Sequence, residues 1–479
     1  MNSFPAQGRP AEEILQQIDH MKSHDMDSTG SRLWSLVYYH SPEVLQLAQE
    51  VYARYISENA LNPLAFPSLR RMENEVVSIV KGLLHCPPAG GGTMTSGGTE
   101  SIFLALKAAR DYARMHKPHL SHLEVVAPLS AHPAFDKAAH YLGLRLIHTP
   151  LDSDGAADVS AMEAAISERT VLLVGSAPSY PHGVVDPIPQ IAELAQRKGL
   201  LFHVDACVGG FILPFLERIG LPIPPFDFRV EGVTSLSVDL HKYGYTPKGA
   251  SVILYRERAL RRHQFFVYGG WNGGIYASSS FSGTRSAGAI AAAWAVLQYL
   301  GETGFVAAAQ AAWETTRRIH SAISDIAELY VIGRPAATVF AIGAHPPLDI
   351  YALGDALAKR RWFLDRQQRP ASLHLTVTAG HARVVEEFIR DLREAVAEER
   401  LRLGRGAWRR RMGRTAVRAG LAVLPERWVR SMARWISRTA QTDRPPRRTA
   451  ALYGMMASLP QQGSVEKLVE DFLDQALGA

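Results

Sequence analysis

The chain has 479 residues, of which 47% are hydrophobic and 20% are charged, so it has ample material for a folded core. Its two cysteines, Cys86 and Cys207, exclude a disulfide framework and a four-thiolate metal site, and they favour a reducing compartment. The formal net charge is +6, but the segment 400–448 alone holds fifteen arginines, no lysine and two acidic residues. The basic character therefore belongs to that segment, and we expect no nucleic-acid partner.

The first 32 residues are polar and contain no apolar stretch of the kind that a signal peptide needs. No run of about twenty uninterrupted apolar residues occurs, so we expect no membrane-spanning helix. Together with the cysteine content, these features predict a cytoplasmic protein.

Helical patterns come first, at 40–60 and 69–84, and a regular alternation of strands and helices begins near residue 95. Strand–helix units joined by short links predict an α/β fold with a mostly parallel sheet and helices on both faces. The predicted helices are 99–116, 133–142, 161–166 and 188–198, and the predicted strands are 124–128, 145–148, 171–175, 200–204 and 235–238.

Two long helical patterns, at 288–300 and 304–327, lead out of this large domain. The patterns that follow predict a smaller C-terminal α/β domain, with strands in 329–342 and 372–377 and helices at 382–397 and 465–477. We therefore divide the chain into an N-terminal helical segment (1–94), a large domain (95–300) and a small domain (301–479) that contains the arginine-rich segment.

A glycine-rich stretch, Gly90 to Ser101, runs directly into the helix predicted at 99–116. Glycines let a ligand approach the backbone closely, and the free N–H groups at the start of a helix hold an anion. The stretch is not a Walker phosphate loop, because no Gly-Lys-Ser/Thr follows it. By itself it fits either a phosphate site or an ordinary glycine turn.

Asp205 and Lys242 complete the predicted site. Asp205 closes an apolar strand, where parallel sheets bind ligands, although an isolated aspartate there is more often a helix cap or an ion-pair partner. Lys242 follows the strand at 235–238, and alone it would be read as a surface lysine. A phosphate cradle, a strand-end aspartate and a later His-Lys pair, in this order, are the parts that pyridoxal 5′-phosphate requires. The lysine amine forms a Schiff base with the cofactor, and the aspartate keeps the pyridine nitrogen protonated.

At these motifs the sequence resembles the group II pyridoxal-phosphate-dependent decarboxylases and, within that family, the sphingosine-1-phosphate lyases. The resemblance is dense from about 30 to 300, thinner to 399 and absent across 400–448. It implies the aspartate-aminotransferase-like fold (fold type I of the pyridoxal-phosphate-dependent transferases). The similar stretches are 95–102, 131–138, 175–178, 181–187, 203–211, 237–249, 273–278, 282–285 and 451–455.

The resemblance also implies roles for individual residues. The catalytic residues would be Lys242, Asp205, His132 and His241, with His132 stacked on the pyridine ring. The cofactor-binding residues would be Gly98, Thr99, His132, Asp205, His203, Lys242 and Ser278. The substrate-binding residues would be Tyr39, Asn59, Asn62, Lys248 and Tyr276.

The resemblance also bears on the choice between two tyrosines and on the oligomeric state. Tyr39 is favoured over Tyr38 because His40 follows it as in the family, but Tyr38 is only one residue away. The segment 1–94 and the loops around Tyr276 and Arg285 are expected to contribute to a homodimer whose subunits share their active sites.

The sequence departs from the family pattern at two places. Asn62 occupies the position of a histidine that helps to hold the substrate phosphate, and an asparagine donates a hydrogen bond but no charge. Ser279 replaces a proline. Both changes leave the cofactor chemistry untouched and bear only on the substrate.

The leading hypothesis is a lyase that cleaves the C2–C3 bond of a phosphorylated long-chain amino alcohol, giving a fatty aldehyde and ethanolamine phosphate. The base is open among His241, Tyr39 and a substrate phosphate oxygen. The main alternative is an L-amino-acid decarboxylase, because Asp205 and Lys242 serve both reactions equally. A third alternative is a cofactor-binding or lipid-binding protein without turnover, which the intact Lys242 disfavours.

The arginine-rich segment contains an apolar stripe at helical spacing, formed by Trp428, Met432, Trp435 and Ile436. Such a helix either packs on the protein body or lies in a membrane interface. A lipid substrate favours peripheral membrane contact through 400–440, while nucleic-acid binding fits less well because the tryptophans lie on the apolar stripe.

Overall fold

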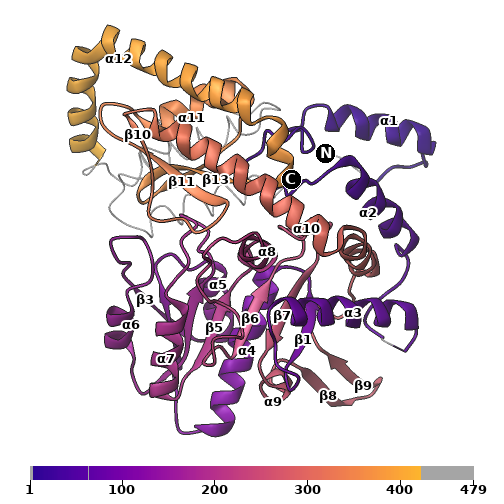
Figure 1. Cartoon of the computed structure of the whole chain (residues 1–479). Coiled ribbons are helices and arrows are strands. Elements are labelled where there is room, and N and C mark those ends of the chain that lie inside the picture. Colours follow the sequence, from indigo (N-terminus) through magenta and orange to yellow (C-terminus); the bar gives the residue numbers. More distant parts are fainter. Residues whose placement is uncertain (1–3, 63, 422–479) are drawn as a thin grey trace. The chain divides into compact units, whose positions relative to one another are not determined.

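The computed structural model describes residues 4–62 and 64–421, and over 404–421 it describes only the helical backbone (Figure 1). The chain forms two compact units. The larger unit comprises Trp34–His345 and Leu373–Ile389, and the smaller unit comprises Met1–Leu33, Pro346–Ser372 and the chain from Arg390. The division at 94 and 300 that the sequence suggested remains a prediction.

A seven-stranded sheet forms the centre of the larger unit, in the order β1-β7-β6-β5-β4-β2-β3. Neighbouring strands from β6 to β3 run parallel, and only β7 runs against its neighbours β6 and β1. The mostly parallel sheet predicted from the sequence is therefore confirmed. The strands are β1 (Gly91–Thr95), β2 (Glu124–Pro128), β3 (Arg145–Thr149), β4 (Thr170–Ser176), β5 (Leu201–Asp205), β6 (Ser235–Val238) and β7 (Ser251–Tyr255).

Helices cover both faces of this sheet because alternate strand residues point to opposite sides. Val125 and Ala127 of β2 pack in a cluster with α4 (Gly98–His116) and α5 (Ala134–Leu142). Val126 of β2 joins the larger cluster on the other face. That cluster includes side chains of α2 (Pro42–Arg54), α3 (Pro67–Leu83), α6 (Val159–Ala165), α7 (Ile188–Lys198), α8 (Leu213–Arg218) and α10 (Ala287–Ser324). A short helix, α9 (Arg258–Arg262), follows β7.

α10 is a core helix that bends at Gly301, whose φ of 56° interrupts the helical backbone. Among the described helices, it is the one whose length and composition would allow it to cross a membrane. However, 56% of its apolar stretch is buried inside the protein. A buried core helix passes the same test, so length and composition alone do not make α10 a membrane span.

Two smaller antiparallel arrangements complete the larger unit. β10 (Leu329–Val331) pairs with β11 (Val339–Ala344), which pairs with β13 (Ala371–Thr376) through Leu373–Thr376. The hairpin of β8 (Phe266–Trp271) and β9 (Gly274–Ser278) stands apart, and every residue of β8 is exposed.

The smaller unit contains α1 (Ala11–Lys22), α11 (Ile350–Lys359), β12 (Asp365–Gln368) and most of α12 (Val385–Leu421). α12 extends the helix predicted at 382–397 into the arginine-rich segment. The apolar stripe from Trp428 to Ile436, the helix predicted at 465–477 and the family-like stretch 451–455 lie outside the described residues.

Candidate active site

A cavity of about 400 Å³ opens at the carboxyl ends of β4, β5 and β6. This edge of a parallel sheet is where α/β folds bind their ligands, because strand ends and helix starts meet there. Six of the residues predicted from the sequence line this cavity: Gly98, Thr99, His132, Asp205, His241 and Lys242.

The start of α4 provides an anion site on one side of the cavity. Gly97 is the N-terminal cap and offers no side chain, so the first N–H groups of the helix have no side-chain acceptor from the cap. A Cβ atom on Gly98 would lie 2.6 Å from Cys207 Sγ and 2.9 Å from Asp239 Oδ2. Gly98 therefore has no room for a side chain, and its backbone is open to a phosphate group.

Glu100 holds the approach to this helix in shape. Its Oε2 accepts hydrogen bonds from the Ser96 N–H at 2.6 Å and from the Ser96 hydroxyl at 2.7 Å. Its Oε1 accepts a hydrogen bond from the Phe281 N–H at 2.7 Å. One buried carboxylate thus joins the glycine stretch to the loop after β9.

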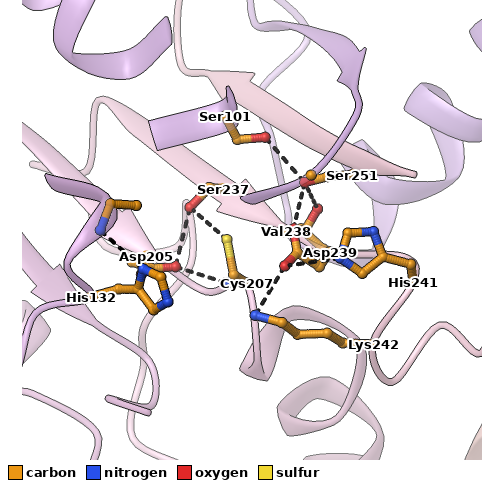
Figure 2. Close-up of polar contacts among 12 residues, drawn as sticks. Ser101, His132, Asp205, Cys207, Ser237, Val238, Asp239, His241, Lys242 and Ser251 are labelled. Carbon is orange, nitrogen blue, oxygen red and sulfur yellow. Dashed lines mark hydrogen bonds and ion pairs between the residues drawn. The ribbon is translucent and has the colours of Figure 1, made fainter. Parts of the chain in front are cut away.

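Asp205 ends β5 and faces the cavity with a nearly buried carboxylate. Its Oδ1 accepts hydrogen bonds from the Cys207 N–H at 3.0 Å and from the Ser237 hydroxyl at 3.3 Å (Figure 2). His132 Nδ1 accepts a hydrogen bond from the Ala134 N–H at 3.1 Å, which leaves Nε2 as the protonated nitrogen of the neutral ring. Burial lowers the pKa of His132, although the nearby Asp205 opposes this shift.

Lys242 lies opposite, with its side chain 22% exposed and its Nζ 3.0 Å from Asp239 Oδ2 (Figure 2). Burial disfavours the charged amine, but the groups around it, led by the Asp239 carboxylate, together outweigh burial and raise the pKa of Lys242 above its ordinary value. His241 Nε2 lies 3.6 Å from the same Oδ2, and burial lowers the pKa of His241. Asp239 was not singled out from the sequence, although its place three residues before Lys242 could have drawn attention to it.

Two residues predicted to bind the cofactor do not line the cavity. His203 lies within β5, where its Nδ1 is 2.9 Å from Ser235 Oγ and its Nε2 is 3.2 Å from Ser237 Oγ. Ser278 ends β9, and its hydroxyl donates to the carbonyl oxygen of Ser280 at 2.7 Å. His203 supports the strand that carries Asp205, and Ser278 shapes its own loop.

The structure separates the two candidate tyrosines. Lys248 Nζ lies 5.3 Å from the centre of the Tyr38 ring and donates a hydrogen bond to the His241 carbonyl at 3.3 Å. The ring of Tyr39 lies instead under the guanidinium of Arg383, at 5.1 Å. Tyr38, rather than Tyr39, is thus adjacent to the second lysine.

A second, mostly apolar cavity of about 340 Å³ begins at these tyrosines. It continues along α2, past Val44, Ala48 and Ile56, and is bounded on the other side by Tyr245 and the residues that follow it.

The remaining residues predicted to bind the substrate lie in surface segments. Asn59 Nδ2 donates to the Thr284 hydroxyl at 3.2 Å, and Asn59 Oδ1 accepts from the Arg285 N–H at 3.3 Å. Asn62 is exposed, and its Oδ1 accepts a hydrogen bond from the Leu64 N–H at 3.0 Å. The Arg285 guanidinium is held in its own chain by Glu73 at 2.6 Å. Tyr276 lies on the exposed hairpin.

These residues fit pyridoxal phosphate. The glycine cradle at α4 suits its phosphate, the buried carboxylate of Asp205 suits its protonated ring nitrogen, and Lys242 supplies the amine. The cavity also contains buried polar atoms, Ser176 Oγ and His241 Nδ1, that have no hydrogen-bond partner within residues 4–62 and 64–421. Such atoms are costly unless a ligand or water pairs with them.

The sequence model described as the pyridoxal-dependent decarboxylase conserved domain matches residues 3–339. The chain belongs to this family. It is therefore a pyridoxal-phosphate-dependent lyase of the aspartate-aminotransferase-like fold, and the reading without turnover is not supported.

Among relatives in this family, sphingosine-1-phosphate lyase 1 of Rattus norvegicus is 42% identical over 401 residues, which span 83% of this chain and 70% of that protein. A solved sphingosine-1-phosphate lyase of Burkholderia pseudomallei K96243 is 38% identical, with a TM-score of 0.81 over 86% of this chain and 96% of that chain. A probable L-aspartate decarboxylase of Pyrococcus abyssi (strain GE5 / Orsay) is 33% identical over 83% of this chain and 100% of that protein.

Proposed function

We propose that this enzyme cleaves the C2–C3 bond of a phosphorylated long-chain amino alcohol of the sphingosine 1-phosphate type. The products are a fatty aldehyde and ethanolamine phosphate. The observation that carries this proposal is the 42% identity to a sphingosine-1-phosphate lyase over 83% of the chain, against 33% for the decarboxylase relative.

Residues around the cavity would hold the cofactor at four points. The backbone N–H groups at Gly98 and Thr99 would bind its phosphate, and Asp205 would hold a proton on its ring nitrogen. His132 would pack on the ring, and Lys242 would carry the cofactor covalently. When bound, pyridoxal phosphate supplies an electron sink for the carbanion that forms as a bond to the amine-bearing carbon breaks.

The substrate side is formed by residues near the second lysine. Lys248 would pair with the substrate phosphate, and because burial lowers the pKa of this lysine, an anionic partner would favour its charged form. Tyr38 lies beside Lys248 and can donate a hydrogen bond to the substrate. His241, Tyr38 and a substrate phosphate oxygen are candidates for the base that removes the C3 hydroxyl proton.

The apolar cavity along α2 would accept the alkyl chain, because it begins at Tyr38 and its walls are mainly aliphatic and aromatic. Ala53 lines this cavity and is exposed. An Ala53→Trp variant should raise KM for a long-chain substrate and leave KM for a short-chain analogue unchanged. Equal KM changes for both substrates would exclude the cavity as the alkyl site.

The decisive experiment incubates the cofactor-loaded protein with sphingosine 1-phosphate and detects products by mass spectrometry. We expect both the long-chain aldehyde and ethanolamine phosphate, and neither with Lys242→Ala. Lys198→Ala, which changes a surface lysine paired with Glu163, serves as the control and should keep full activity.

Amino-acid decarboxylation remains the second candidate, because the Pyrococcus relative spans 83% of the chain. A screen of amino acids for release of carbon dioxide tests it. Turnover of L-aspartate without cleavage of the phosphorylated amino alcohol would replace the lyase proposal.

We also propose a homodimer in which the β8–β9 hairpin packs against a second copy. Several large apolar side chains are exposed together on this hairpin, which is typical of a surface that packs against another subunit. The hairpin also carries Tyr276, one of the residues predicted to bind the substrate. The double change of Trp271 and Ile275 to serine should give a monomer with reduced activity in sedimentation velocity and kinetic assays, whereas Met115→Ser should leave the dimer intact. An unchanged dimer in the double variant would exclude this interface. The exposed apolar side chains of the hairpin are Phe266, Val267, Tyr268, Trp271 and Ile275, and Phe281 is exposed in the loop that follows it.

Peripheral membrane contact through 400–440 and a cytoplasmic location stay predictions, since the apolar stripe lies outside the described residues. Co-sedimentation with anionic vesicles at low salt tests the membrane contact.

A further inference from the structure

Asp239 is a buried carboxylate beside the cofactor lysine, and the proposed reaction does not use it. It follows β6 directly, and its side chain is 2% exposed. Its Oδ2 faces both members of the His-Lys pair, at 3.0 Å from Lys242 Nζ and 3.6 Å from His241 Nε2 (Figure 2). A buried carboxylate is tolerated only where cations and donors compensate its lost hydration.

One hydroxyl group holds Asp239 in this position, and hydroxyl groups from two further elements adjoin it in a chain. Ser251, at the start of β7, donates a hydrogen bond of 2.6 Å to Asp239 Oδ1. Ser251 Oγ lies 3.1 Å from Ser101 Oγ in the first turn of α4, and Ser101 Oγ lies 2.7 Å from Thr95 Oγ1 at the end of β1. The carboxylate cannot turn away from Lys242 without breaking a buried hydrogen bond.

The same carboxylate also borders the proposed phosphate site. A Cβ atom on Gly98 would lie 2.9 Å from Asp239 Oδ2, so the carboxylate lies against the backbone at the helix start. A carboxylate close to a phosphate repels it unless a cation lies between or beside them. The Lys242 ammonium is that cation in the cofactor-free protein.

We propose that Asp239 is a positioning residue that holds the Lys242 amine as an ammonium at the floor of the cavity, so that capture of pyridoxal phosphate requires this pair to lose a proton. The proposal rests on the part of the proposed function that places the cofactor on Lys242, and not on the identity of the substrate. In the capture step the ammonium releases one proton to solvent. The neutral amine then attacks the cofactor aldehyde, and one water molecule leaves as the C=N bond forms.

The other titratable groups around Lys242 do not provide an equivalent partner. Burial lowers the pKa of Lys242, and Asp239 is the first of the groups that raise it, ahead of Cys207, Tyr38 and Asp205. Burial raises the pKa of Cys207 well above its ordinary value, so this thiol is neutral at pH 7. The cavity also holds His132 and His241, and Lys248 donates a hydrogen bond to the His241 carbonyl. Burial lowers the pKa of all three, and none of them is an anion that could pair with the Lys242 ammonium.

The test measures how fast the cofactor-free protein captures pyridoxal phosphate, followed by absorbance in a stopped-flow instrument from pH 6 to 12, a range that extends beyond the ordinary lysine pKa of about 10.4. In the wild-type protein we expect the rate to rise with pH as Lys242 loses its proton. In Asp239→Asn the midpoint of this rise should move to lower pH by at least about one unit, which is about tenfold more neutral amine at any pH below the midpoint. The rates of each protein are divided by its own rate at the high-pH plateau. A variant that only binds the cofactor more weakly then keeps the wild-type midpoint.

Ser251→Ala is the matched control, because it removes the hydrogen bond to Asp239 Oδ1 and keeps the carboxylate charge. Its midpoint should move by much less than that of Asp239→Asn, because the charge beside Lys242 remains, and thermal unfolding should show that both variants are folded. Equal midpoints in wild type and Asp239→Asn would overturn the proposal, as would a shift in Ser251→Ala as large as that in Asp239→Asn. Failure of the wild-type protein to capture the cofactor at any pH would instead contradict the attachment to Lys242.

If Asp239→Asn does not fold, the same question is answered in the wild-type protein. Competitive labelling of Lys242 with an amine reagent against pH, read by mass spectrometry, should show a midpoint above that of an exposed lysine such as Lys198. A midpoint at or below that of Lys198 would contradict the ion pair.

Discussion

Gly98→Ala should damage cofactor binding through a steric effect that can be read from the structure. The new methyl group would lie 2.6 Å from Cys207 Sγ and 2.9 Å from Asp239 Oδ2, both of which are side chains in a buried, hydrogen-bonded region. Neither atom belongs to the flexible end of a long side chain, so the backbone at the start of α4 must move. Overpacking of this kind costs about 1–3 kcal/mol. If that strain falls on the phosphate-binding conformation, the cofactor Kd rises roughly 5- to 150-fold.

Gly97→Ala provides a matched control one residue away. Its φ of 163° is extended backbone that any residue adopts, and the nearest atom to the new methyl group is His241 Cε1 at 3.4 Å. We expect this variant to bind the cofactor within a few-fold of the wild-type Kd. The assay titrates the cofactor-free proteins with pyridoxal phosphate and follows the absorbance of the lysine adduct, with thermal unfolding recorded beside it.

Equal cofactor affinity in Gly98→Ala and wild type would refute the reasoning, because it would mean that the glycine is not needed for close approach of the phosphate. An equal loss of affinity in both variants would also refute it. In that case the loop would respond to any side chain, and the contacts at Gly98 would not be the cause.

Three further predictions concern other parts of the larger unit. Tyr38→Phe should lower kcat by at least about tenfold, in the range of a lost catalytic proton donor or acceptor, whereas Tyr39→Phe should leave kcat near the wild-type value; the reverse order would restore Tyr39 as the active-site residue. Asn62→His should lower KM for a phosphorylated substrate at pH 6 and not for its unphosphorylated analogue, because the imidazolium adds a positive charge there. Steady-state kinetics with both substrates measures this difference, and an equal change in KM for both would contradict the prediction. Burial lowers the pKa of His203 to about 4. Between pH 6.5 and pH 4 the unfolded chain therefore binds a proton at this histidine and the folded protein does not. The free energy of unfolding should therefore fall by on the order of 3 kcal/mol more in wild type than in His203→Gln as the pH drops from 7 to 4, and parallel denaturation curves across this range would show that His203 is not the cause.

Much of the fold could be predicted because its signals are local. Apolar runs bounded by turns identified the parallel strands, and the structure has β2 and β6 at the predicted residues. The glycine stretch was interpreted as a phosphate site or a glycine turn, and no strand was predicted there, but its first half forms strand β1. β1 and β7 close the sheet by pairing antiparallel across more than 150 residues of sequence, and such a pairing leaves no local pattern.

The sequence by itself determined the chemistry of this protein, because the cofactor imposes short motifs. A glycine-led helix start, a strand-end aspartate at 205 and a His-Lys pair ending at 242 are each readable within a few residues, and their order along the chain decides their meaning.

Only the tertiary structure decided which side chains meet. It brings Asp239 to Lys242, directs Tyr38 rather than Tyr39 toward Lys248, and leaves the β8–β9 hairpin exposed. These outcomes depend on the direction of side chains from distant elements and on the room that packing leaves between them. Neighbouring residues in the sequence do not carry that information, because burial and contact are set by the whole fold.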